Sequence, residues 1–206
     1  MLELFISAFI TLFVVIDPPG CAPIYAGLTS GATNKQARIM ALKASFIAAV
    51  ILFLFAFFGE DLLGALHIEL NSFRIAGGLM LFFIAFEMVF EKRTQRREER
   101  AEKVIAEEVE DVSVFPMAMP MMAGPGAIAA VMLLMNEANG LEQSLVVIAA
   151  LAAVLMLTAF ALLIAGPMMR LFGDSVQNVV TRLLGVLLAA LAAQYVLDGL
   201  KGSFGF

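Results

Sequence analysis

Cysteine and histidine are nearly absent from this chain of 206 residues, which has one of each. A single cysteine, Cys21, cannot form an intrachain disulfide, so cysteine usage gives no information on the redox compartment. With His67 as the only histidine, no constellation of His and Cys ligands for zinc is available. A Walker A phosphate-binding loop is also missing, so any active pumping depends on a gradient or on another subunit. We therefore expect no metal and no other cofactor.

Charged residues are scarce as well. They make up 15% of the chain, hydrophobic residues make up 62%, and the mean hydropathy is +0.95. Soluble domains contain roughly 45–50% apolar residues. The composition therefore predicts an integral protein of the lipid bilayer, and we expect no nucleic-acid partner.

Six segments are apolar and long enough to cross a bilayer, which takes about 20 residues as a helix. They are Glu3–Gly27, Ala41–Leu62, Phe73–Phe90, Val114–Met135, Gln143–Pro167 and Val179–Leu200. We expect helices throughout, because an open strand in lipid would leave backbone groups unpaired. The prediction is an all-α membrane protein with one transmembrane domain over residues 1–206. It is divided into three spans (1–90), a charged loop (91–113) and three further spans (114–206).

The basic residues predict how the chain is oriented in the membrane. All lysines and arginines except Arg74 and Lys201 follow the first, third or fifth segment. Because basic residues favour the cytoplasmic side, loop 91–113 is predicted to be cytoplasmic, and both termini are predicted to lie outside the plasma (inner) membrane. We interpret this mixed-charge loop as a solvated helical linker between the two halves. The alternative is a regulatory or partner-binding segment.

Two proline- and glycine-containing motifs interrupt the first and fourth segments, at Asp17–Pro23 and Pro120–Gly126. Proline lacks an N–H and clashes with the preceding turn, and glycine allows backbone conformations that a break needs. Non-helical backbone at membrane depth is tolerated only when it is buried in protein or lines a cavity. Both helices are therefore predicted to break at their motifs and to form a binding site there.

The two halves of the chain resemble each other. Near the start of the third segment, Arg74-Ile75-Ala76-Gly77-Gly78-Leu79-Met80-Leu81 resembles Arg182-Leu183-Leu184-Gly185-Val186-Leu187-Leu188-Ala189 in the sixth. A glycine, Gly59 or Gly166, closes the segment before each. Because each half has three spans, the halves would cross the membrane in opposite directions. This predicts an inverted repeat that brings the two breaks together near the midplane.

The breaks supply a chemistry that suits a small zwitterion. A helix N-terminus has unsatisfied N–H donors and a partial positive charge, which attract a carboxylate. Asp17 is the only formal negative charge deep in the first segment, so it is a candidate partner for an ammonium group. It is also the candidate site for a coupling proton, whereas exposed carbonyls at the breaks could hold Na⁺. The alternative is that Asp17 only caps the half-helix that follows it.

We predict that the substrate-binding residues come from both motifs and from the last segment. Gln194 lies well inside that segment beside Tyr195, and hydrogen bonding between helices is its alternative role. The predicted residues are Asp17, Pro18, Pro19, Gly20, Pro23, Pro120, Gly124, Pro125, Gly126 and Gln194.

Taken together, these features favour a secondary transporter that moves small neutral amino acids or similar zwitterions by alternating access, coupled to H⁺ or Na⁺. The alternative is an ion or small-solute channel, in which one Asp17 per chain would require an oligomer to form a ring of charge. An enzyme is not expected, because an aspartyl protease needs two carboxylates and Asp17 has no acidic partner at similar depth. The alanine-rich last two segments could pack in a homo-oligomer.

The two motifs also resemble the signatures of a known family. Asp17-Pro18-Pro19-Gly20-Cys21-Ala22-Pro23-Ile24-Tyr25 and the stretch from Pro116 to Ile128 look like the two signatures of the MarC family. The resemblance implies a six-span plasma-membrane protein of bacteria or archaea, similar to the small neutral amino acid transporters, some of which move glycine and alanine in a cation-dependent way. The family pattern allows Asn as well as Asp at the place of Asp17, which argues against an obligatory proton role for this residue.

Overall fold

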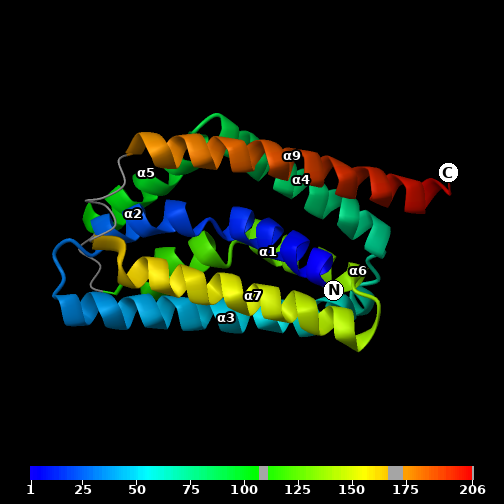
Figure 1. Ribbon diagram of the computed structural model, residues 1–206, viewed down its shortest axis with the longest axis horizontal. Helices are drawn as coiled ribbons and strands as arrows, with labels where there is room; N and C mark the ends of the chain where they lie inside the picture. The colour runs from blue at the N-terminus through cyan, green and yellow to red at the C-terminus, as the bar shows by residue number, and fades with distance from the viewer. Residues whose placement is uncertain (107–110, 167–173, 206) are drawn as a thin grey trace.

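The protein is a bundle of helices, as a computed structural model shows (Figure 1). The structure describes residues 1–106, 111–166 and 174–205, and no strand occurs within them. The helices are α1 (Leu2–Ile16), α2 (Pro18–Leu28), α3 (Asn34–Ala65), α4 (Leu70–Val89), α5 (Lys92–Ala106), the irregular helix η1 (Ser113–Met122), α6 (Pro125–Glu137), α7 (Gly140–Leu163) and α9 (Asp174–Phe204). The predicted all-α class is confirmed for the described residues.

Five helical stretches are long and apolar enough to cross a membrane, and a sixth follows if the bent pair of η1 and α6 counts as one span. Large apolar side chains lie exposed on the outer helix faces, among them Phe57 of α3, Phe83 of α4 and Phe160 of α7. Lipid tails solvate such faces, whereas water would not. The surface thus agrees with the composition in indicating an integral, multi-pass membrane protein.

Most helix boundaries differ from the predicted segments by a few residues. The largest difference is at α3, which begins at Asn34 rather than Ala41. Thr33 and Gln36 form a capping box there, in which each side chain binds the other residue's backbone N–H. The fifth segment forms a helix to Leu163, and its predicted end at Pro167 lies outside the described residues.

The helices form layers along the bundle. Figure 1 shows α4 beside α9 at one edge, α3 beside α7 at the other, and the α1–α2 segment between these pairs. Both termini lie at the same end of the bundle. An even number of crossings gives this arrangement, which agrees with the six predicted segments.

Close packing of α4 against α9 depends on glycine. A Cβ atom on Gly78 of α4 would lie 2.8 Å from the carbonyl oxygen of Ala192, and one on Gly185 of α9 would lie 2.9 Å from Cβ of Met88. Helices in lipid associate through van der Waals packing and not through water exclusion, so small residues at the contact favour association. Gly78 and Gly185, which lie in the similar stretches of the third and sixth segments, therefore allow these two helices to pack closely.

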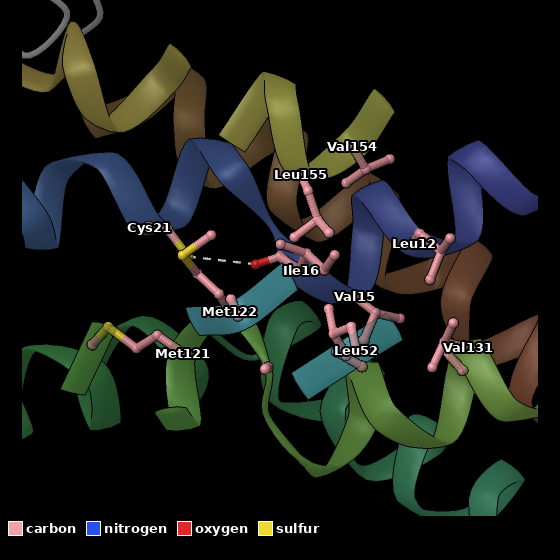
Figure 2. Close-up of a cluster of buried hydrophobic side chains, with 14 of the residues drawn as sticks. Leu12, Val15, Ile16, Cys21, Leu52, Met121, Met122, Val131, Val154 and Leu155 are labelled. Atoms are coloured by element: carbon pink, nitrogen blue, oxygen red, sulfur yellow. Dashed lines mark hydrogen bonds between the residues drawn. The ribbon is translucent and has the colours of Figure 1, made fainter. Parts of the chain in front are cut away.

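The core surrounds the two Pro/Gly motifs. Figure 2 shows apolar side chains converging from the α1–α2 segment, from η1 and α6, and from α3 and α7. They are Leu12, Val15, Ile16, Leu52, Met121, Met122, Val131, Val154 and Leu155. These contacts hold the ends of α1 and η1 close to each other inside the bundle.

Helix α5 corrects the interpretation of loop 91–113 as a solvated linker. Its segment is helical, as expected, but it packs against α2, α4 and η1. One face carries Arg93, Arg97, Ala101 and Val104, all buried. A buried arginine needs partners, and those partners lie at the two Pro/Gly motifs.

Candidate functional site

The first motif interrupts the helix at one residue. Helix α1 ends at Ile16, Asp17 adopts the left-handed conformation (φ 60°, ψ 65°), and α2 begins at Pro18. Aspartate tolerates this conformation better than most residues, and proline suits the first turn of a helix. Oδ1 of Asp17 accepts a hydrogen bond from the Gly20 N–H at 3.1 Å. Asp17 therefore caps α2, as the alternative interpretation of this residue predicted.

Two other residues of this motif have different roles. A Cβ atom on Gly20 would lie 2.2 Å from Oδ2 of Asp17, so no side chain fits beside the carboxylate. Pro23, by contrast, lies within α2, which continues to Leu28. The break thus depends on Asp17 and the residues directly after it, and Pro23 does not end the helix.

Arg97 of α5 forms an ion pair with Asp17. Its Nη1 lies 2.8 Å from Oδ2 of Asp17, and its Nη2 donates a hydrogen bond to the carbonyl oxygen of Met121 at 3.4 Å. Asp17 is 4% exposed and Arg97 6% exposed, so both charges are buried. A buried charge is tolerated only when it is paired and hydrogen-bonded. The Asp17 carboxylate and the Arg97 guanidinium provide this pairing for each other.

Arg93 lies one turn before Arg97 and reaches the same region. Its Nη2 donates to the carbonyl oxygen of Val15 at 2.5 Å, and its Nη1 lies 3.1 Å from Sδ of Met88. Burial, followed by the neighbouring charge of Arg97, lowers the pKa of Arg93 to about 10. The side chain is still protonated at neutral pH.

These two arginines link both interrupted helices. The carbonyl oxygen of Val15 lies in the last turn of α1, and that of Met121 lies in the last turn of η1. The C-terminal end of a helix has unpaired carbonyls and a partial negative charge. Two guanidinium groups one turn apart on α5 therefore neutralise the ends of two half-helices at once.

The second motif is built differently. Helix η1 contains extended residues at Phe115 and Met119, and α6 begins at Pro125 after a bend of 51°. Gly124 occupies the N-cap position, and no side chain of the described structure caps α6. A Cβ atom on Gly124 would lie 2.3 Å from the carbonyl oxygen of Pro120, so the backbone itself requires glycine.

A pocket of about 210 Å³ opens at this second motif. Four arginines of α5 line one side of it: Arg93, Arg96, Arg97 and Arg100. Pro120 and the start of α6, from Gly124 to Ala127, line the other, with Val15 and Ile84 completing the wall. The structure thus brings together four predicted site residues, namely Pro120, Gly124, Pro125 and Gly126, and Asp17 contacts the pocket through Arg97.

A second carboxylate also meets these arginines. Oε2 of Glu87, near the end of α4, lies 2.7 Å from Nη2 of Arg96 without hydrogen-bond geometry, and Glu87 is buried. The arginine cluster therefore contacts α1, α4 and η1 as well as the start of α6.

Other predicted site residues lie elsewhere. Gln194 is exposed on α9 and donates to the carboxylate of Asp198 in the same helix, at 2.9 and 3.0 Å. It is not among the residues that line the arginine pocket, so the prediction that Gln194 lines the site is corrected. Pro18, Pro19, Gly20 and Pro23 belong to the α2 side of Asp17 and do not line the arginine pocket.

Two larger pockets, of about 510 and 490 Å³, lie around the α2–α3 connection and include neither break. Their size alone gives no chemistry, whereas the smaller pocket combines buried charge with a helix terminus. No group of three or more His, Cys, Asp or Glu side chains that could hold a metal ion occurs in the part of the chain that the structure describes.

Comparison with known proteins agrees with the two motifs. A family model described as MarC family integral membrane protein matches residues 2–204. The chain belongs to the MarC family. A UPF0056 membrane protein of Archaeoglobus fulgidus is 34% identical over 200 residues, which cover 97% of this chain and 93% of the relative.

Bacterial relatives are equally similar. The UPF0056 membrane protein YvbG of Bacillus subtilis is 34% identical over 205 residues, covering 99% of this chain and 97% of YvbG. YhcE of Escherichia coli is 32% identical over 197 residues, covering 95% and 91%. No solved structure matches the chain. The resemblance to the MarC family noted in the sequence is thus confirmed over nearly the whole length.

Proposed function

We propose that this MarC family protein is a secondary transporter for small neutral amino acids or similar small zwitterions. The observation that carries the proposal is the buried Asp17–Arg97 ion pair, which lies where two interrupted helices meet. Ionisable residues inside a membrane protein are costly and mark functional sites. Interrupted helices that converge on such residues are typical of transporter binding sites. The proposed activity is binding and translocation, without a covalent step.

Cross-packing between the halves supports an inverted repeat. The α1–α2 segment packs against α7 of the second half, and the η1–α6 segment packs against α3 of the first. At the α4–α9 contact, Gly185 meets Met88, while Gly78 meets Val196. When Arg74 is aligned with Arg182, Met88 and Val196 occupy equivalent positions, and Gly185 corresponds to Gly77, the neighbour of Gly78. The two contacts are therefore related to within one residue, which supports a pseudo-two-fold relation between the halves.

In the proposed mechanism, the substrate carboxylate binds at the N-terminus of α6, and its ammonium group replaces Arg97 as the partner of Asp17. The half-helix carbonyls that Arg93 and Arg97 now occupy would hold the coupling Na⁺, or Asp17 would take up H⁺. One half of the chain then moves against the other around this site, which exposes it to each side in turn. The positive-inside rule supports both termini lying outside the inner membrane.

Uptake into proteoliposomes tests this proposal. Labelled glycine and alanine are supplied under separate H⁺ and Na⁺ gradients, and saturable uptake driven by one of them is expected. Asp17→Asn should lower coupled uptake by tenfold or more, because asparagine retains the cap and the backbone conformation but not the charge. Asp111→Asn, at an exposed carboxylate away from both motifs, is the matched control.

Two results would contradict the proposal. Folded protein that moves no amino acid under either gradient would rule out the transporter. Uptake that rises linearly with concentration, without saturation or exchange, would indicate a channel instead.

A further inference from the structure

Four arginines line the pocket at the second motif, and the described residues provide carboxylate partners for two of them. Among the described residues, Asp17 pairs with Arg97 and Glu87 pairs with Arg96. Arg93 and Arg100 also line the pocket, and neither forms an ion pair with a carboxylate in the described parts of the chain. Within the described residues, two of the four guanidinium groups therefore have no carboxylate partner, and the buried one, Arg93, bonds to the carbonyl oxygen of Val15 instead.

Within the described ranges, the wall of the pocket opposite α5 contributes N–H donors and no negatively charged side chain. Helix α6 begins at Pro125 with no side-chain cap in the described structure, and its first N–H groups have no intrahelical acceptor. The positive end of its dipole adds to the field of the arginines. Gly124 and Gly126 both line the pocket, where the side chain of Ile84 packs against Gly126 and the carbonyl oxygen of Pro120 lies beside Gly124.

We propose that this pocket binds a small oxyanion, a carboxylate or phosphate-type group, between Arg93 and Arg100 of α5 and the N-terminus of α6. The site shares the N-terminus of α6 with the substrate carboxylate of the proposed function, but binding there needs neither an ammonium group on the ligand nor movement of the halves. Guanidinium groups are planar forks that bind two oxygens of a carboxylate or phosphate at once. Such an ion would give Arg93 and Arg100 the anionic partner that no carboxylate of the described residues provides, in a partly dehydrated site where charge pairing is strong.

Two sources offer this chemistry in a membrane. One is a free solute such as inorganic phosphate, and the other is the headgroup of an anionic phospholipid, which basic pockets between membrane helices also bind. The shared group is the oxyanion, and the experiment separates the two sources.

The test is ligand-dependent thermal stability of the full-length protein in neutral detergent at constant ionic strength. In one arm inorganic phosphate is titrated, with chloride as the balancing anion; in the other, phosphatidylglycerol is compared with phosphatidylcholine. We expect one of the two anionic ligands to raise the unfolding midpoint in a saturable way. In Arg100→Gln its Kd should be about tenfold weaker, the usual loss for one charge-assisted hydrogen bond.

Two further variants make the test decisive. Arg100→Lys keeps the charge and should retain most of the binding. Lys103→Gln removes a positive charge from the same helix outside the pocket and should bind as the unmodified protein does. Protection by phosphate identifies a free solute, and protection by phosphatidylglycerol alone identifies a headgroup. The proposal is overturned if neither ligand protects, or if Arg100→Gln and Lys103→Gln bind equally well.

This outcome is separate from that of the transport experiment, since binding is measured without a gradient. Amino acid uptake without oxyanion binding would remove only this inference. Oxyanion binding without uptake would remove only the proposed function.

Discussion

The two helix breaks contain similar residues but satisfy their backbone groups in different ways. At the first, the carboxylate of Asp17 caps α2 and pairs with Arg97, so the protein's own side chains complete the break. At the second, Gly124 leads into α6 without a side-chain cap in the described structure, and the helix start lines a pocket. Proline and glycine therefore determine where a helix is interrupted, while the neighbouring charges determine whether the interruption is closed or open to a ligand.

Removing Arg97 should have the largest effect on stability. Arg97→Gln leaves the buried carboxylate of Asp17 without its cation, and breaking a buried ion pair costs about 3–5 kcal/mol. The free energy of unfolding, measured by denaturation with SDS in mixed micelles, reports this loss.

The double variant Asp17→Asn/Arg97→Gln should recover most of that stability, because neither charge then remains unpaired. Arg182→Gln is the control, since Arg182 is 54% exposed in its pair with Glu91 and such pairs contribute at most about 1 kcal/mol. Equal losses for Arg97→Gln and Arg182→Gln would show that the Asp17–Arg97 pair is not buried as described.

Replacing a glycine with alanine at each break should reveal a further difference between the two breaks. In Gly124→Ala the Cβ meets a backbone carbonyl, which cannot move without shifting η1, whereas in Gly20→Ala it meets the Asp17 side chain. Overpacking costs about 1–3 kcal/mol. We expect both variants to unfold at lower temperature, and only Gly20→Ala to displace the Asp17 carboxylate from its ion pair with Arg97.

Gly27→Ala provides the control for these glycines. It lies in α2 with no atom within 4 Å of the added Cβ, so helix propensity alone should make it neutral or up to about 1 kcal/mol more stable. If Gly124→Ala behaves like Gly27→Ala, the backbone at the second break is less constrained than the structure indicates.

The smallest effect is expected at an exposed carboxylate, Asp111. It accepts hydrogen bonds from the N–H and hydroxyl of Ser113, at 2.9 and 2.5 Å, and pairs with Lys43. The bond from Lys43 first, and those from Ser113 next, lower the pKa of Asp111 from 3.8 to about 2. The ionised group thus stabilises the fold above pH 4, and this contribution disappears as the pH falls from about 4 to about 2.

Asp111→Asn should flatten the pH dependence of the unfolding temperature in that window. Because both side chains are about half exposed, the change should stay below about 1 kcal/mol. An unchanged slope between pH 4 and 2 would assign the acid sensitivity to other carboxylates.

The positions of both breaks could be predicted from sequence because their causes are local. Proline at 18, 19 and 125 cannot donate to a preceding turn, and the residues that flank these prolines accept the required conformations. The cap by Asp17 also follows from residue type, since aspartate before a helix binds its first N–H groups. Local chemistry of this kind does not depend on which other helix packs nearby.

The role of α5 could not be predicted from its composition. A run of mixed charges usually lies in water, and nothing in its sequence specifies that Arg93 and Arg97 meet α1 and η1 from far along the chain. One signal was present: Arg93, Arg97, Ala101 and Val104 recur at helical spacing on one face. Because Ala101 and Val104 share a helix face with the two arginines, the pattern indicated that this face packs against the protein.

The covalent connection of α5 to α4 through Phe90 and Glu91 has a consequence for affinity. A guanidinium held on a short tether is present near Asp17 at an effective concentration on the order of millimolar or more. Every free cation that binds the Asp17 carboxylate competes with the guanidinium of Arg97. A ligand of Asp17 therefore binds with an apparent Kd raised by the occupancy of Arg97, and shortening or lengthening the 90–91 turn would tune that constant without altering any residue in contact with the ligand.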